Sequence, residues 1–345
     1  MKKEYSIKVL FGNITKLLHE SGSLDTEYYV QNGLDASIIT FDEGVHASDS
    51  AYITRNPITK KNEARLSVAF CQFYWLICDI ILKYADISIV KEECSKSNKH
   101  LRDYYEEALY FKYLYENNKE IPFVIPKGYC AKDFYDYLNK IIPLLDETQF
   151  NRKQKEELDL ALSIITNEEM IDFERISKID YDHGYSTTTN SAFCFGIAFI
   201  LKHELGHHAC GHLDKVDKTL QDEEAADELA LWVDKTDSEI LDSRQRFSRF
   251  AGILCCLTSL FFLNPKLEID EDDPHPTEDC RLFNAYKEIM KDDPNPKYAY
   301  LIYKTLSFWS EYFSIPNFPQ ANSDYTTIIP KIESFFEQYK QNIEE

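Results

Sequence analysis

The sequence has few of the features that mark fibrous, low-complexity or secreted chains. Only 10 glycines and 12 prolines occur among 345 residues, which argues against a collagen-like or low-complexity chain. The nine cysteines include no Cys-x-x-Cys pair, and residues 1–5 do not resemble the start of a secretory signal. Reduced thiols in a cytoplasmic protein are therefore the simplest interpretation.

Long apolar runs and an excess of positive charge are also missing. The best apolar stretches, 68–82 and 250–263, are shorter than the roughly 18 residues of a membrane span, and polar residues interrupt both. We expect them to be buried core helices. The formal net charge of −21 would repel nucleic acid and anionic membranes, so we expect neither as a partner.

Apolar and aromatic residues are plentiful, and their spacing predicts a packed fold. The chain is 44% hydrophobic and contains 22 Phe and 23 Tyr residues, enough for a sizeable core. Residues 36–40, 51–55 and 64–66 are predicted strands, with a hairpin turn at 56–62. Most later segments have helical spacing: about 68–84, 88–117, 131–144, 151–165, 190–212, 221–234, 238–263, 276–290, 296–314 and 327–343.

This pattern predicts a mainly helical α+β fold. Residues 1–67 would form its β-rich N-terminal part and residues 68–345 its helical part, together in one continuous domain. The sequence shows no internal repeat and no linker rich in Gly or Ser that would separate two domains.

The strongest motif is a His-Glu-x-x-His sequence formed by His203, Glu204 and His207. Histidines four apart on a helix project from one face, and two imidazole nitrogens can reach one zinc ion at about 2.0–2.1 Å. Glu204 would face the same cleft and could take a proton from an attacking water. Thr189 or Asn190 could cap this helix. Two histidines on an exposed helix are the alternative interpretation.

A third metal ligand is predicted at Glu223, sixteen residues after His207. Catalytic zinc usually has three protein ligands and one open position. Glu223 begins a Glu-x-x-Ala-Asp sequence, so on a helix it shares a face with Asp227, which could orient a ligand histidine. Alanines in this segment would allow the two helices to approach closely. An acidic first turn that complements the helix dipole is the alternative.

His212 competes with Glu223 for the role of third ligand. The metzincin pattern requires Gly and His three and six residues after the second histidine, where this chain has Cys210 and Leu213. We therefore interpret His212 as a residue at the helix end that supports the metal site. Glu224 is a weaker candidate ligand, because its partner four residues later is Glu228 and not the Asp of the motif.

A third segment begins at His275 and continues through Pro276 to Arg281. In an enzyme that hydrolyses acyl groups, His275 could donate a hydrogen bond where negative charge develops on the carbonyl oxygen. Arg281 could pair with a carboxylate of the site. A helix started by Pro276, with an incidental histidine before it, is the alternative.

The order of these three motifs resembles gluzincin peptidases, and more closely the Lit-like family of phage-exclusion peptidases. The aromatic run 66–75 and the apolar runs 197–201 and 252–257 are similar in character as well. The resemblance covers roughly residues 36–85 and 190–290. It implies a zincin-like fold, with a small N-terminal β-sheet over the helix that carries His203.

The resemblance also implies a function. Lit-like proteins are zinc peptidases of bacterial antiviral defence that cut a host protein, elongation factor Tu, after a phage capsid peptide activates them. We expect Zn²⁺ as cofactor and a strand near residues 51–55 that binds substrate by strand addition. A repressor-cleaving metallopeptidase of stress or mobile-element regulation and a non-catalytic, zinc-stabilised phage-sensing module are the alternatives.

Overall fold

The structure is a computed structural model, and most of its described residues are helical, as the sequence predicts. The described residues are 8–19, 34–42, 51–55, 58, 60, 62–122, 125, 130–145, 147–166, 185–212, 215, 219–239, 241–265, 267, 276–321 and 325–344.

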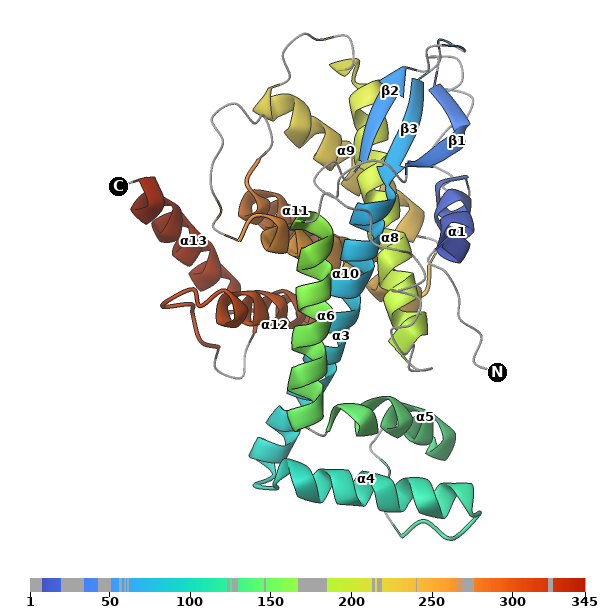
Figure 1. The fold of residues 1–345 in the computed structure, drawn as a ribbon, viewed down its shortest axis with the longest axis vertical. Coiled ribbons are helices and arrows are strands. Elements are labelled where there is room, and N and C mark those ends of the chain that lie inside the picture. Colours follow the sequence, from blue (N-terminus) through green and yellow to red (C-terminus); the bar gives the residue numbers. More distant parts are fainter. Residues whose placement is uncertain are drawn as a thin grey trace.

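A small N-terminal sheet covers the helix that carries the His-Glu-x-x-His motif. Its strands are β1 (Leu34–Asp42), β2 (Ala51–Arg55) and β3 (Asn62–Ser67), in the order β1-β3-β2. β3 pairs in parallel with β1 and antiparallel with β2, which leaves β2 at an edge of the sheet that the described residues form. β2 and β3 contact α8 (Tyr185–Ala209), as Figure 1 shows. The predicted α+β arrangement, with this sheet over α8, is therefore confirmed.

The first 67 residues also contain a helix, α1 (Lys8–His19), which the sequence analysis did not predict. Its apolar side chains at positions 10, 11, 14 and 18 recur at helical spacing and are buried. They pack α1 against α8, so this part of the chain supports the motif helix with both a sheet and a helix.

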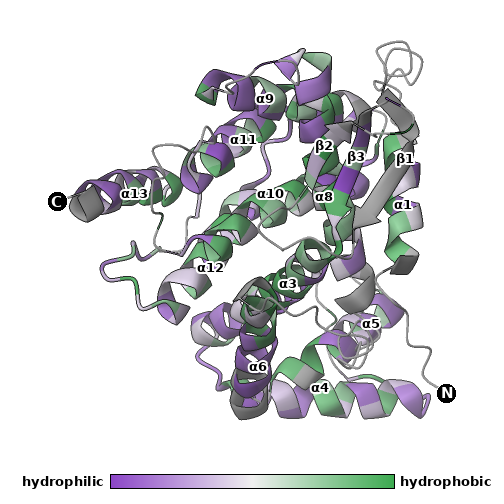
Figure 2. Cartoon of the chain, turned by 45° about the horizontal axis from the view of Figure 1, so that its top comes forward, coloured by the Kyte–Doolittle hydropathy of each residue, from purple (hydrophilic) through white to green (hydrophobic). Residues whose placement is uncertain are grey.

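The core is built around three long helices: α3 (Val68–Lys96), α8 and α10 (Ser243–Leu263). The hydroxyl of Tyr74 on α3 lies 3.3 Å from the carbonyl oxygen of Ala192 and 3.0 Å from that of Gly252, so it joins the three helices. Long hydrophobic stretches mark α3 and α10 in Figure 2. α10 is long and apolar enough to cross a membrane, but 72% of its most apolar window is buried inside the fold, as in a core helix.

α8 begins earlier than predicted, at Tyr185, so neither Thr189 nor Asn190 caps it. Both residues instead attach α8 to α3. The Thr189 hydroxyl donates to a carboxylate oxygen of Asp79 at 2.8 Å, and the side-chain oxygen of Asn190 accepts from the indole of Trp75 at 2.9 Å. The expected cap is wrong because these polar side chains form hydrogen bonds with side chains of α3 and not with the backbone N–H groups at the start of α8.

The predicted helix over 88–117 is also wrong as a single element. α3 runs to Lys96, and the chain then turns through Asn98, whose φ of 53° asparagine tolerates, before α4 (Leu101–Glu116) begins. α4 and α5 (Ala131–Ile141) lie at the foot of the molecule, followed by the 3-10 turn η1 (Ile142–Leu144), and α6 (Glu147–Thr166) returns along α3 (Figure 1). The C-terminal helices are α11 (Glu278–Asp292), α12 (Pro296–Tyr312) and α13 (Ile329–Glu344).

Candidate metal centre

The candidate centre forms where α9 (Leu220–Ser238) crosses the last turns of α8. A Cβ atom added to Gly206 would lie only 3.1 Å from the Cα and carbonyl oxygen of Ala226, so the two backbones approach very closely here. Ala226 and Ala230 are fully buried between the helices. The small residues therefore allow the contact that the alanines of this segment predict.

A capping box fixes the start of α9. The Thr219 hydroxyl oxygen accepts a hydrogen bond from the Asp222 backbone N–H, and Asp222 Oδ2 accepts one from the Thr219 backbone N–H at 3.0 Å. A hydrogen bond from Lys215, partly offset by desolvation, lowers the pKa of Asp222 to about 2. With the helix start fixed, Glu223 falls in the first turn and Asp227 one turn later on the same face.

Three donor atoms converge between the helices. His203 Nε2 lies 3.2 Å from His207 Nε2 and 3.2 Å from Glu223 Oε2, and His207 Nε2 lies 3.1 Å from the same oxygen. Ligand atoms at the corners of a zinc tetrahedron with bonds of 2.0–2.1 Å are about 3.3 Å apart. All three side chains are buried, and together they could hold a metal ion.

Asp227 contacts the first of these histidines. Its Oδ1 lies 2.8 Å from His203 Nδ1, and Arg281 of α11 contacts both of its oxygens at 2.7 and 2.8 Å. Burial alone would lower the pKa of His203, but hydrogen bonds to Asp227 and Glu223 raise it to about 9. Burial opposes ionisation of Asp227, yet Arg281 and His203 hold its pKa well below the usual range. The charged carboxylate thus directs His203 Nε2 toward Glu223.

His212 lies behind His207 and not at the point where the three donors meet. α8 ends at Ala209, and Gly211, with a φ of 73°, reverses the chain. His212 Nδ1 consequently lies 3.1 Å from His207 Nδ1, on the ring edge opposite Glu223. The predicted helix over 190–212 is therefore wrong at its end, because α8 stops at Ala209 and Gly211 turns the chain before His212.

The other predicted site residues have different environments. Glu204 is half-buried on α8, next to His203. Glu224 is exposed, unlike Glu223, which agrees with its weaker claim as a ligand. His275, the predicted oxyanion donor, lies outside the described residues.

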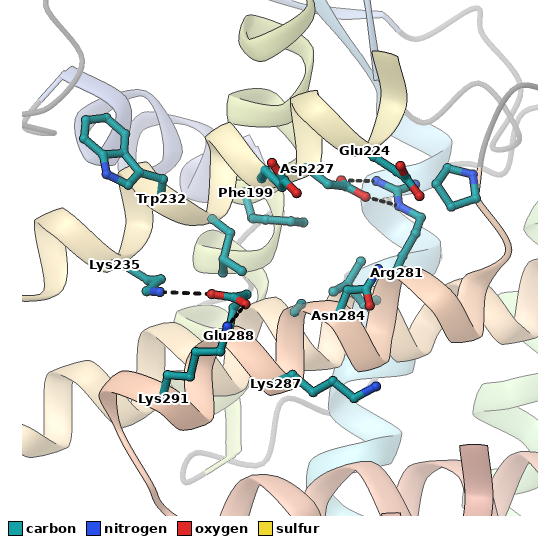
Figure 3. A pocket seen from close by; sticks show the side chains of 15 residues that line it. Phe199, Glu224, Asp227, Trp232, Lys235, Arg281, Asn284, Lys287, Glu288 and Lys291 are labelled. Atoms are coloured by element: carbon teal, nitrogen blue, oxygen red, sulfur yellow. Dashed lines mark hydrogen bonds and ion pairs between the residues drawn. The ribbon is translucent and has the colours of Figure 1, made fainter. Parts of the chain in front are cut away.

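A pocket of about 800 Å³ lies beside the Asp227–Arg281 pair, between α9 and α11. Phe199, Leu231 and Leu257 contribute apolar side chains to its lining. Figure 3 shows the Arg281–Asp227 contacts at one end and the ion pair of Lys235 with Glu288 at the other. Of the residues in this lining, only Asp227 and Arg281 were predicted from the sequence to support the site; that the lining residues come together depends on the packing of separate helices, which leaves no local pattern in the sequence.

The part of the chain that contains the candidate centre is similar to a peptidase family. The model of the family Peptidase U49 matches residues 142–301, somewhat less than half of the chain. The match contains all three donor residues, Asp227 and Arg281. It supports a proteolytic function. Searches of curated proteins and of solved structures found no match.

The close approach at Gly206 predicts a stability effect. Gly206→Ala places a methyl group against the Ala226 backbone, and we expect it to lower the free energy of unfolding by about 1–3 kcal/mol despite the better helix propensity of alanine. Gly12→Ala on α1 is the matched control, because its added Cβ meets no atom within 4 Å. Urea unfolding of both variants measures the difference. Equal stability of the two variants would contradict the tight crossing.

Proposed function

We propose that this protein is a zinc-dependent peptidase whose metal ligands are His203, His207 and Glu223. The observation that carries the proposal is the set of three buried donor atoms separated by 3.1–3.2 Å, which fits tetrahedral zinc. Two imidazoles and one carboxylate also form a known ligand set of zinc peptidases, with the fourth position open for chemistry. The Peptidase U49 match supports the reaction class.

Each residue of the site then has a defined task. Zinc, when bound, supplies Lewis-acid chemistry: it polarises a peptide carbonyl and makes water more acidic. Glu204 takes the proton of the attacking water and passes it to the leaving amine. Asp227, held by Arg281, keeps Nε2 of His203 directed inward. We assign the oxyanion hydrogen bond to His275 on the sequence motif alone.

An extended polypeptide is the substrate that this architecture favours. β2 is an edge strand that contacts α8, so it could pair with a substrate segment by strand addition. The pocket beside Arg281 could accept a substrate side chain. From the family resemblance we propose a host protein as target, elongation factor Tu first among the candidates, with a phage-derived peptide as activator in antiviral defence.

The decisive test is Glu204→Gln. Loss of the general base should reduce cleavage of purified elongation factor Tu, assayed on gels with the phage capsid peptide present, by about 10²–10⁴-fold. Zinc content should stay unchanged, because Glu204 is not among the three converging donors. Glu239→Gln is the matched control: it alters an exposed carboxylate at the end of α9, outside the pocket lining, and should retain full activity. Full activity of Glu204→Gln would overturn the mechanism.

The pocket gives an independent test of substrate binding. Asn284 is exposed on α11 and lines the pocket, so Asn284→Trp would narrow it without disturbing the core. Loss of one side-chain contact should lower kcat/KM by about 10–200-fold, mainly through KM, while zinc content is retained. Cys280→Trp lies on the same helix, is exposed and is outside the pocket lining, so it is the control. Unchanged KM in Asn284→Trp would exclude this pocket from substrate binding.

A further inference from the structure

We infer that His212, held by Asp222, is a positioning residue that fixes the ring form of His207 required for metal binding. The inference rests on the proposed metal site but concerns residues that are not ligands. It predicts that metal affinity depends on a hydrogen-bonded chain running from His207 through His212 to the first turn of α9.

The series of contacts from His207 through His212 to Asp222 is continuous and buried. Nδ1 of His207 lies 3.1 Å from Nδ1 of His212, and Nε2 of His212 lies 3.3 Å from Oδ1 of Asp222. Asp222 is itself held by Lys215 and by the Thr219 backbone and hydroxyl. The side chains of His207, His212 and Asp222 are all nearly inaccessible to solvent, so water competes poorly for these bonds.

The positions of the hydrogens follow from the geometry. A histidine that binds metal through Nε2 is neutral and carries its only ring hydrogen on Nδ1. Nδ1–H of His207 must then donate to Nδ1 of His212, which therefore carries its own hydrogen on Nε2. That hydrogen points to Asp222, whose ionised carboxylate can only accept. The opposite tautomer of His212 would set two N–H groups against each other at 3.1 Å.

Both histidines of the proposed site are thus oriented from the same helix. Asp227 contacts Nδ1 of His203 directly, whereas Asp222 acts on Nδ1 of His207 through His212. Glu223, the third donor, lies between these two carboxylates in the sequence of α9. One oxygen of Asp222 also belongs to the capping box, so the same group sets the start of α9 and the ring form of His207.

Zinc affinity, measured by chelator competition, tests the inference without an activity assay. His212→Phe keeps the ring volume but removes the acceptor, and we expect zinc affinity about 10–100-fold weaker than wild type. His212→Asn places an amide oxygen where the ring has Nδ1, so it should recover most of that loss. Thr219→Ala is the control: it removes the hydroxyl of the capping box but leaves the His212–Asp222 contact, and affinity should remain near the wild-type value.

The outcomes separate this inference from the proposed function. If the wild-type protein binds no zinc after reconstitution, the proposed metallopeptidase fails and the inference fails with it. If wild type binds zinc and the folded Phe variant binds it equally well, only the inference is overturned. An equal loss in the Phe and Asn variants, or a Thr219→Ala loss as large as that of Phe, would also overturn it, because the effect would then come from packing or from the cap. Circular dichroism restricts the comparison to folded variants.

Discussion

Glu223→Ala is expected to abolish stable zinc binding. Glu223 is fully buried, and its Oε2 completes the triangle of donor atoms with the two histidines. Without it only two imidazoles remain, and the loss of affinity should exceed the roughly 10–100-fold cost of altering a residue that merely supports a ligand. Metal analysis of dialysed protein should find near-stoichiometric zinc in wild type and only traces in Glu223→Ala and His203→Ala.

Two control variants test whether the loss of zinc is specific to Glu223. Glu224→Ala removes the adjacent but exposed carboxylate and should retain zinc, so a general effect of reduced negative charge on α9 can be recognised. His212→Ala should retain zinc at stoichiometric concentrations, because its expected defect is only a weaker affinity. Zinc retained without Glu223 but lost without His212 would reverse the assignment of the third ligand. Absence of zinc from every preparation, even after reconstitution, would remove the basis for a metallopeptidase.

The sequence could predict which residues of the candidate centre share a helix face, because that follows from local helix periodicity. His203 and His207 are one turn apart on α8, and Glu223 and Asp227 are one turn apart on α9. A small-residue contact between the helices is also suggested by the alanines of α9. The structure brings these four side chains together, while their roles as ligands and support remain predictions for the zinc measurements.

The features that sequence could not predict depend on single backbone conformations or on contacts between distant segments. Gly211 turns His212 back onto His207, whereas helical extrapolation carried the chain past it. Asn98 similarly divides an apolar pattern that reads as one helix. Thr189 has the character of a cap, but its hydroxyl bonds to Asp79, more than 100 positions away in the sequence. No local pattern contains such long-range pairings.

Asp234→Ala is expected to lower the free energy of unfolding more than Gly206→Ala does. Asp234 of α9 accepts from Lys202 of α8 at 2.6 Å, and its carboxylate lies 3.6 Å from the guanidinium of Arg249 on α10. All three residues are buried. Removal of this carboxylate would take from both buried cations an ion-pair partner that they share, and breaking a buried ion pair typically costs about 3–5 kcal/mol. Domains are commonly stable by only about 5–15 kcal/mol, so the variant should unfold at markedly lower denaturant.

An exposed ion pair with the same N···O distance shows how much of the expected loss of stability is due to burial and how much to the ion pair itself. Lys132 and Asp136 are also 2.6 Å apart but are largely exposed, so Asp136→Ala should cost less than about 1 kcal/mol. Urea unfolding of the two variants compares the same chemical change in two environments. Lys202 directly precedes His203 on α8. If its ion pair with Asp234 helps to hold α8 against α9, zinc should stabilise Asp234→Ala less than it stabilises wild type. Asp234→Ala with stability as close to wild type as Asp136→Ala would show that packing alone holds the three helices.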